Sequence, residues 1–155
     1  MKAVLHYRAS PGFRRRLAET APDWLSLAVV EEADVGGFAR EMADAEALLH
    51  VLEPVTASHI AGAPALRLIQ KIGVGVNTID LEAAAARDIA VCNMPGTNSQ
   101  AVAELTLALM LAALRRIALF DRETRAGRGW AADLAHFDAI GEVSGRTVGL
   151  VGFGE

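Results

Sequence analysis

The stretch Lys71–Asp80, which reads KIGVGVNTID, runs from a predicted strand through two closely spaced glycines towards a predicted helix. Asp80 is a suitable N-cap, since its carboxylate can accept a hydrogen bond from the free N–H groups of the first turn. Gly73 and Gly75 allow a tight turn in which successive backbone N–H groups can bind a carboxylate or phosphate. The segment fits an ordinary glycine-containing turn equally well. Both interpretations predict one strand–turn–helix unit of a parallel sheet.

Similar units extend on both sides of this stretch. Short apolar runs alternate with Ala-rich segments, which is typical of an α/β domain with a parallel sheet. Most of the runs are apolar throughout, as expected of strands that are buried on both faces. We therefore predict a doubly wound parallel sheet over residues 1–97. The predicted strands are Lys2–Tyr7, Leu25–Glu31, Ala47–Leu52, Leu66–Ile72 and Ala90–Asn93, and the predicted helices are Phe13–Ala21, Phe38–Ala45, Thr56–Ala61 and Leu81–Arg87.

Composition and charge exclude several classes of protein. Of the 155 residues, 52% are hydrophobic and 22% are charged, which is enough apolar surface for a packed core. The 15 basic residues are scattered among 19 acidic ones and the net charge is −4, so we expect no nucleic-acid partner. Cys92 is the single cysteine, which fits a reducing compartment, and we expect a cytoplasmic protein without a metal site. The apolar run Leu105–Leu114 is far shorter than the ~20 residues that span a bilayer, so no membrane partner is expected.

The pattern changes after residue 97. One long helix is predicted from Ser99 to Ala126, and its first half is apolar on nearly every side, so we expect it to be buried between domains or between subunits. We predict a connecting helix over residues 98–127, a loop over 128–143 and the start of a second domain over 144–155. In this last part the strand Val148–Val151 enters a turn at Gly152 and Gly154. The two glycines fit the opening of a dinucleotide-binding fingerprint, and they also fit a simple turn.

Three segments together resemble the D-isomer-specific 2-hydroxyacid dehydrogenases, a family that includes phosphoglycerate, glyoxylate/hydroxypyruvate and formate dehydrogenases. The resemblance is loose before residue 45 and close after residue 66. It implies a flavodoxin-like substrate domain over residues 1–97, followed by the first strand of a Rossmann domain for NAD or NADP. The segments are Gly73–Leu81, then Val91–Pro95 with Asn98 and Val102–Leu105, and then Gly145–Gly154.

The resemblance also implies substrate-binding residues. In such relatives the backbone at the positions of Val74 and Gly75 meets the substrate carboxylate, and the position of Val74 also meets the nicotinamide end of the cofactor. Asn98 corresponds to a residue near the same cleft. His50 stands where phosphoglycerate-oxidising relatives often have Arg, and an imidazole holds phosphate less well than a guanidinium. A glyoxylate- or hydroxypyruvate-like substrate is therefore favoured, although the simpler interpretation of His50 is a buried strand histidine with a satisfied ring.

Gly152 and Gly154 are the implied contacts to the cofactor, while the family's catalytic Arg, Glu and His have no counterpart among the 155 residues. We therefore expect a truncated portion of an NAD(P)-dependent oxidoreductase, which transfers hydride between nicotinamide and a small 2-hydroxy or 2-oxo acid. By itself this portion is expected to be inactive and to bind no cofactor. The resemblance also implies a homodimer through the helix that begins at Ser99. The alternative function is a stand-alone carboxylate-binding or dimerisation module that regulates a full-length relative.

Overall fold

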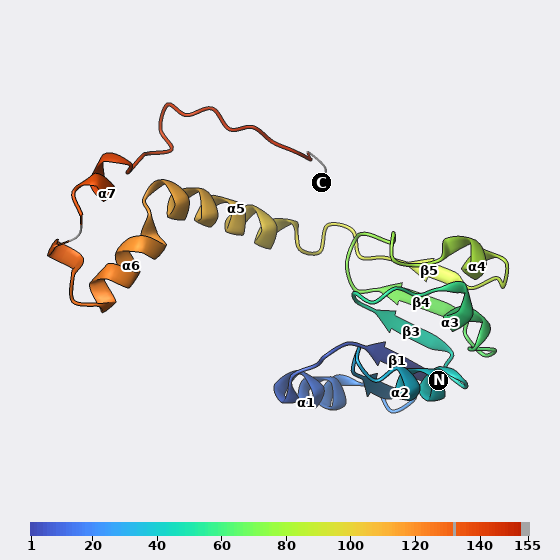
Figure 1. Ribbon diagram of the computed structural model, residues 1–155. Helices are drawn as coiled ribbons and strands as arrows, with labels where there is room; N and C mark the ends of the chain where they lie inside the picture. Colours follow the sequence, from blue (N-terminus) through green and yellow to red (C-terminus); the bar gives the residue numbers. More distant parts are fainter. Residues whose placement is uncertain (132, 153–155) are drawn as a thin grey trace. The chain divides into compact units, whose positions relative to one another are not determined.

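The computed structural model describes residues 1–131 and 133–152, which divide into two compact units, Met1–Pro95 and Gly96–Glu155 (Figure 1). The first unit is an α/β layer structure and the second is helical. The first contains β1 (Lys2–His6), α1 (Pro11–Thr20), β2 (Ser26–Val30), α2 (Val35–Met42), β3 (Ala47–His50), α3 (Ala57–Ala61), β4 (Leu68–Lys71), α4 (Leu81–Ala85) and β5 (Ala90–Cys92). The second contains α5 (Ser99–Leu114), α6 (Ile117–Arg125), the 3-10 helix η1 (Gly129–Ala131) and α7 (Ala135–Asp138).

The sheet of the first unit is parallel throughout, with the strand order β2-β1-β3-β4-β5. This is the flavodoxin-like order, so the predicted doubly wound α/β fold is confirmed. Each predicted strand and helix of this unit overlaps an observed one. The helices begin where side chains cap them: Ser10 accepts from the N–H of Phe13, and Asp80 accepts from the N–H of Ala83 at 2.9 Å.

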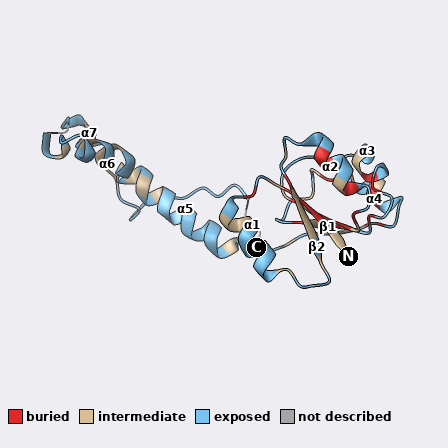
Figure 2. Cartoon of the chain, turned by 90° about the horizontal axis from the view of Figure 1, so that it is seen from below, coloured by how far each residue is buried: buried red, intermediate tan, exposed pale blue. Residues whose placement is uncertain are grey.

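Helices cover the two faces of the sheet unequally. Helix α1 lies on one face, where Phe13 and Leu17 meet Leu5 and Leu49. Helices α2, α3 and α4 lie on the other face and enclose the hydrophobic core with side chains from the central strands. At the centre of this core Val4, Leu48 and Ile69 are all 0% exposed, and burying each such side chain contributes about 1.5–3 kcal/mol. The buried residues accordingly lie in the sheet, in the helices packed on it and in the loops that join them (Figure 2).

The prediction that the strands are buried on both faces is wrong for β5. Ala90 and Cys92 are exposed, and only Val91 between them packs against the core. The pairing places Ala90 and Cys92 on the same side of the sheet as Leu68 and Gln70, and α1 lies over the strands at the other end of that side. The Cys92 thiol is therefore open to solvent.

The prediction of one uninterrupted helix over 99–126 is also wrong, because the helix breaks between α5 and α6. Arg116 has a φ of 53°, a left-handed conformation that ends an α-helix. The Leu114 carbonyl, which a continuous helix would use internally, instead accepts a hydrogen bond of 2.9 Å from the N–H of Gly141. Phe120 and Phe137 pack at 5.1 Å between ring centroids, which holds the later segment against α6.

Helix α5 has no buried residue, and most of its large apolar side chains are exposed, while Met110 and Leu114 are half-buried (Figure 2). The predicted strand Val148–Val151 is not formed, since the described residues 144–152 have no regular secondary structure. A parallel strand exists only through hydrogen bonds to neighbours, and the described chain places no strand beside this segment. Gly154, predicted to contact the cofactor, lies outside the described residues. No helix within residues 1–131 and 133–152 is long and apolar enough to cross a membrane.

Candidate functional site

The loop between β4 and α4 lies at the carboxyl end of the parallel sheet, where open α/β proteins bind ligands. Its first glycine, Gly73, has a φ of 146°, which residues with a Cβ rarely adopt. The carbonyls of the loop are bound by the chain that follows β5. The Gly73 carbonyl accepts from the N–H of Met94 at 2.9 Å, and the Val74 carbonyl accepts from Nδ2 of Asn93 at 2.9 Å. These two bonds fix the loop against β5.

The N–H groups at the glycines of the same loop remain available to bind a ligand. Within residues 1–131 and 133–152, no acceptor is bound by the N–H of Gly73, Val74 or Gly75. Val74 is 49% exposed, so the loop faces solvent. A Cβ on Gly75 would lie 3.0 Å from Oδ1 of Asn77, and glycine avoids that crowding. Successive N–H groups without an acceptor among the described residues, in a loop whose Gly73 and Val74 carbonyls are already bound, can bind a carboxylate.

The last residues of the neighbouring strands β1, β3 and β4 carry polar side chains. His6, His50 and Lys71 are paired in register across β1, β3 and β4, so their side chains point to the same face of the sheet. All three are buried. Placing two imidazoles and an ammonium side by side in a protein interior disfavours charge on the imidazoles.

His50 is 0% exposed, and its Nε2 lies 2.8 Å from Oγ1 of Thr78 in the β4–α4 loop. Burial, together with the charge of Lys71 and the neighbouring His6, lowers the pKa of His50 from 6.5 to about 4. The ring is therefore neutral at pH 7. Its Nδ1 is buried and has no hydrogen-bond partner among the described residues.

Lys71 is 8% exposed, and its ammonium donates a hydrogen bond to the carbonyl of Val51, just after β3. The two loops of this edge are also joined directly. The N–H of Val55 donates to the Thr78 carbonyl at 2.8 Å, and the N–H of Asp80 donates to the Val55 carbonyl at 2.9 Å. The loops that follow β3 and β4 thus form one connected structure.

His6 lies further along the same edge and is held by aromatic contacts. Its ring stacks on Phe38 of α2 with 4.0 Å between centroids, and Phe38 in turn meets His59 edge-on at 5.4 Å. Burial lowers the pKa of His6, and the nearby carboxylates of Glu32 and Glu53 oppose this in part. This stack packs α2 and α3 against the sheet, below the loops that face solvent.

The structure brings some of the predicted site residues together. Val74, Gly75 and His50 all belong to the carboxyl edge of the first unit, with His50 under the loops rather than on the surface. Asn98 and Gly152 belong to the second unit; Asn98 precedes α5 and is exposed, and its side chain makes no capping bond.

Sequence reasoning missed Lys71, Thr78 and Asn93. Lys71 and Asn93 could have been found from position alone, because each lies at the carboxyl end of a predicted strand and such ends meet at one edge of a parallel sheet. Thr78 lies further along the loop, and nothing in its position marks it.

The described residues do not by themselves form a cradle for a dinucleotide. Such a cradle needs a strand, a glycine turn and the N-terminus of a helix, and residues 144–152 form neither strand nor helix. Gly152 has a φ of 86° with open space around its Cα, as a glycine of such a turn would. Among the described residues, no three His, Cys, Asp or Glu side chains are grouped so that they could hold a metal ion.

Comparison with known proteins identifies the family. The catalytic domain of the D-isomer specific 2-hydroxyacid dehydrogenases matches residues 5–148. A glyoxylate reductase from Korarchaeum cryptofilum is 37% identical over 113 residues, which cover 72% of this chain and 34% of that protein. A D-3-phosphoglycerate dehydrogenase from Mycobacterium leprae is 38% identical over 128 residues, which cover 83% of this chain and 21% of that protein.

A solved structure gives the same result. The NAD+-bound 3-phosphoglycerate dehydrogenase of Entamoeba histolytica superposes with a TM-score of 0.61 at 25% identity, over 74% of this chain and 39% of that one. The chain thus spans about a third of the length of the glyoxylate reductase and less of the phosphoglycerate dehydrogenase. From the match over residues 5–148, we conclude that this chain belongs to the D-isomer specific 2-hydroxyacid dehydrogenase family.

Proposed function

We propose that this chain supplies the substrate-binding part of an NAD- or NADP-dependent oxidoreductase, which transfers hydride between a nicotinamide and a small 2-hydroxy or 2-oxo acid. The observation that carries this proposal is the β4–α4 loop, called the substrate loop below. Within the described residues its N–H groups at Gly73, Val74 and Gly75 bind no acceptor, while the carbonyls of Gly73 and Val74 are bound. The names of the relatives support the reaction class, since they include a glyoxylate reductase and an NAD+-bound dehydrogenase.

In this proposal the substrate carboxylate accepts hydrogen bonds from the N–H groups of Val74 and Gly75. Backbone donors suit this task because they are fixed by the fold and need no reorganisation when the anion binds. Val74 also meets the nicotinamide end of the cofactor, while Gly152 and Gly154 approach its pyrophosphate. The family resemblance also assigns Asn98 to substrate binding, and His50 supports the substrate loop through its bond to Thr78.

We propose an unphosphorylated substrate of the glyoxylate or hydroxypyruvate kind. A phosphate group binds best to cations that form charge-assisted hydrogen bonds. At this edge His50 is buried and its pKa is about 4, and the ammonium of Lys71 is already bound to the carbonyl of Val51. Neither side chain is free to neutralise a phosphate, so phosphoglycerate is the less favoured substrate.

We further propose a homodimer that forms through α5, because most large apolar side chains of this helix are exposed, Leu105 and Leu109 among them. A cytoplasmic location fits the proposal, since the exposed thiol of Cys92 stays reduced there. Replacing Leu105 and Leu109 by Glu should convert the dimer to a monomer in analytical ultracentrifugation, and a monomeric parent chain would contradict this part.

The enzymatic proposal is tested by activity. The 155-residue chain should not oxidise NADH with glyoxylate or hydroxypyruvate, because the family's catalytic Arg, Glu and His have no counterpart among its residues. A fusion of residues 1–148 to the remaining part of the Korarchaeum cryptofilum glyoxylate reductase should reduce glyoxylate and prefer it to phosphohydroxypyruvate. Turnover by the chain alone would refute its inactivity. A folded fusion that binds NADH but reduces no 2-oxo acid would favour the alternative, a stand-alone carboxylate-binding or dimerisation module.

A further inference from the structure

The buried ammonium of Lys71 is costly for the fold. Moving an ammonium from water into the protein costs several kcal/mol unless a partner compensates. Within residues 1–131 and 133–152 no carboxylate pairs with Lys71, and the hydrogen bond of its Nζ goes to the neutral carbonyl of Val51. An apolar side chain would satisfy the packing at this position at lower cost, so stability alone does not explain a lysine there.

The side chain of Lys71 also lies close to Gly73, the first glycine of the substrate loop. A Cβ built on Gly73 would lie 3.4 Å from Cε of Lys71, which is van der Waals contact. The stem of Lys71 therefore lies close to Gly73 and limits the room around it, while its ammonium donates to the Val51 carbonyl in the neighbouring loop. Lys71 thus connects β4, the β3–α3 loop and the substrate loop.

The far end of the substrate loop is held from the adjacent strand. His50 bonds through Nε2 to Oγ1 of Thr78 at 2.8 Å, and the carbonyl of His50 accepts from the N–H of Ile72 at 2.8 Å. His50 therefore forms hydrogen bonds with Ile72, before the two glycines, and with Thr78, after them. Lys71 and His50 are also neighbours on one rung of the sheet.

We propose that Lys71 and His50 are positioning residues, which with Thr78 hold the Gly73–Gly75 loop in the shape that binds a carboxylate. Neither side chain touches the substrate. Each acts by fixing the backbone whose N–H groups do, so the loop is ready for the anion before it arrives and loses little entropy on binding. This inference rests on the proposed function, because it assumes that the loop binds the substrate carboxylate.

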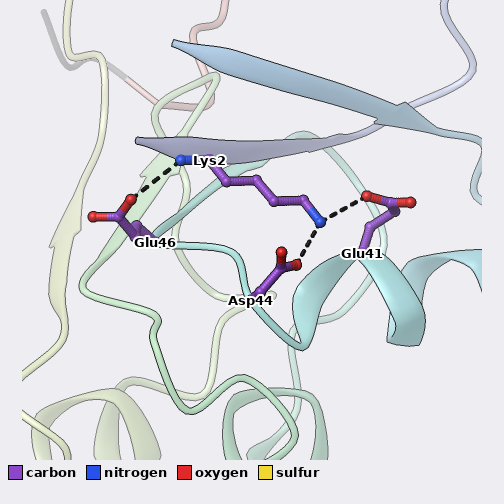
Figure 3. Close-up of polar contacts among 4 residues, drawn as sticks. All are labelled: Lys2, Glu41, Asp44 and Glu46. Atoms are coloured by element: carbon purple, nitrogen blue, oxygen red, sulfur yellow. Dashed lines mark hydrogen bonds and ion pairs between the residues drawn. The ribbon is translucent and has the colours of Figure 1, made fainter. Parts of the chain in front are cut away.

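The test uses isotope-labelled chain, with sodium oxamate as an unreactive 2-oxo acid analogue. Lys71→Met removes the ammonium and keeps an unbranched stem. Lys2→Met is the matched control, because Lys2 is the only other lysine and bonds to Asp44 at 2.5 Å and Glu41 at 2.8 Å from the start of β1 (Figure 3). The pair Thr78→Val and Thr78→Ser removes or keeps the hydroxyl that His50 binds. Oxamate affinity is measured for every variant, together with the exchange rates of the loop amides. These are the N–H groups of Val55, Ile72 and Met94, whose hydrogen bonds to the carbonyls of Thr78, His50 and Gly73 hold the loop.

Lys71→Met and Thr78→Val should each lower oxamate affinity by about tenfold, as the loss of an ordered hydrogen bond at a binding loop predicts. These loop amides should exchange faster, while those of the core strands should not change. Lys2→Met and Thr78→Ser should match the wild type. If Lys71→Met and Thr78→Val bind oxamate normally and their loop amides exchange at the wild-type rate, the positioning role is wrong.

The two proposals can fail separately. If the wild-type chain binds no oxamate at the loop, the proposed function loses its main support. The exchange rates are measured without ligand, so they still decide the positioning role: faster loop exchange in Lys71→Met supports it and unchanged exchange overturns it. If Lys71→Met does not fold, Thr78→Val decides the same question, because this substitution keeps the side-chain volume.

Discussion

Replacing Gly73 by Ala tests whether the backbone of the substrate loop carries the binding site. Gly73 has a φ of 146°, and holding a residue with a Cβ in such a conformation costs about 1–3 kcal/mol. The new methyl group would lie 3.4 Å from Cε of Lys71, an ordinary contact, so backbone strain dominates the effect rather than a clash. The loop then either keeps its shape at that cost or relaxes and moves the N–H groups of Val74 and Gly75.

Both outcomes are measurable. Urea unfolding followed by circular dichroism gives the loss of stability, and titration with sodium oxamate gives the affinity of the loop. If the loop keeps its shape, we expect the free energy of unfolding to fall by about 1–3 kcal/mol. If the loop relaxes, the free energy of unfolding should fall by less, and oxamate should bind at least about tenfold more weakly. Gly127→Ala is the matched control, since Gly127 has a φ of 75° and open space around it in the second unit. Gly127→Ala should lower the free energy of unfolding and leave oxamate affinity unchanged.

The reasoning is refuted if Gly73→Ala is as stable as the wild type and binds oxamate equally well. That result would mean that residue 73 does not need its left-handed backbone, and that the free N–H groups of the loop are not the binding element. A loss of oxamate binding in Gly127→Ala would also contradict the account, because it would place the site elsewhere.

Three further predictions concern pH, the loop and the core. The pKa of His50 is about 4 in the folded chain, against 6.5 ordinarily. Between these pH values the unfolded state binds the proton more tightly than the folded state. The free energy of unfolding should therefore be largest above pH 6.5 and should fall as the pH is lowered towards 4. Melting temperatures should fall more steeply in the wild type than in His50→Gln, which keeps the smaller contribution of buried His6, and equal pH profiles would contradict the prediction. Asn93→Ala removes the donor to the Val74 carbonyl; we expect about 0.5–1.5 kcal/mol lower stability and weaker oxamate binding, and unchanged binding would argue against this tether. Leu48→Ala should cost about 2–5 kcal/mol in urea unfolding because Leu48 is 0% exposed, whereas Leu107→Ala at a site 59% exposed should cost little in the monomer; equal losses would contradict the assigned core.

Much of the first unit follows from local sequence. Strands that alternate with capped helices predict a parallel sheet, and the cap at Asp80 is confirmed by its bond to the N–H of Ala83. The same pattern places the glycine loop of Lys71–Asp80 at the carboxyl edge. The family resemblance on these residues is confirmed by the match over residues 5–148.

The remaining features depend on contacts that local sequence does not contain. The helix breaks at Arg116 although its composition favours continuation, because Gly141 returns to bind the carbonyl at the end of α5. The burial of Lys71 and its bond to Val51 depend on the register of three strands, which is a property of the assembled sheet. The predicted strand Val148–Val151 needs neighbouring strands that the described chain does not provide.

The central claim is that the backbone of residues 73–75 binds the carboxylate of a small 2-oxo acid. It is tested most directly by titrating the isotope-labelled chain with sodium glyoxylate and, separately, with 3-phosphoglycerate, while the backbone amide resonances are followed. We predict saturable shifts at Gly73, Val74 and Gly75 with glyoxylate, and weaker binding of 3-phosphoglycerate at the same amides. Unmoved resonances at these three residues, or saturable shifts confined to another part of the chain, would contradict the account.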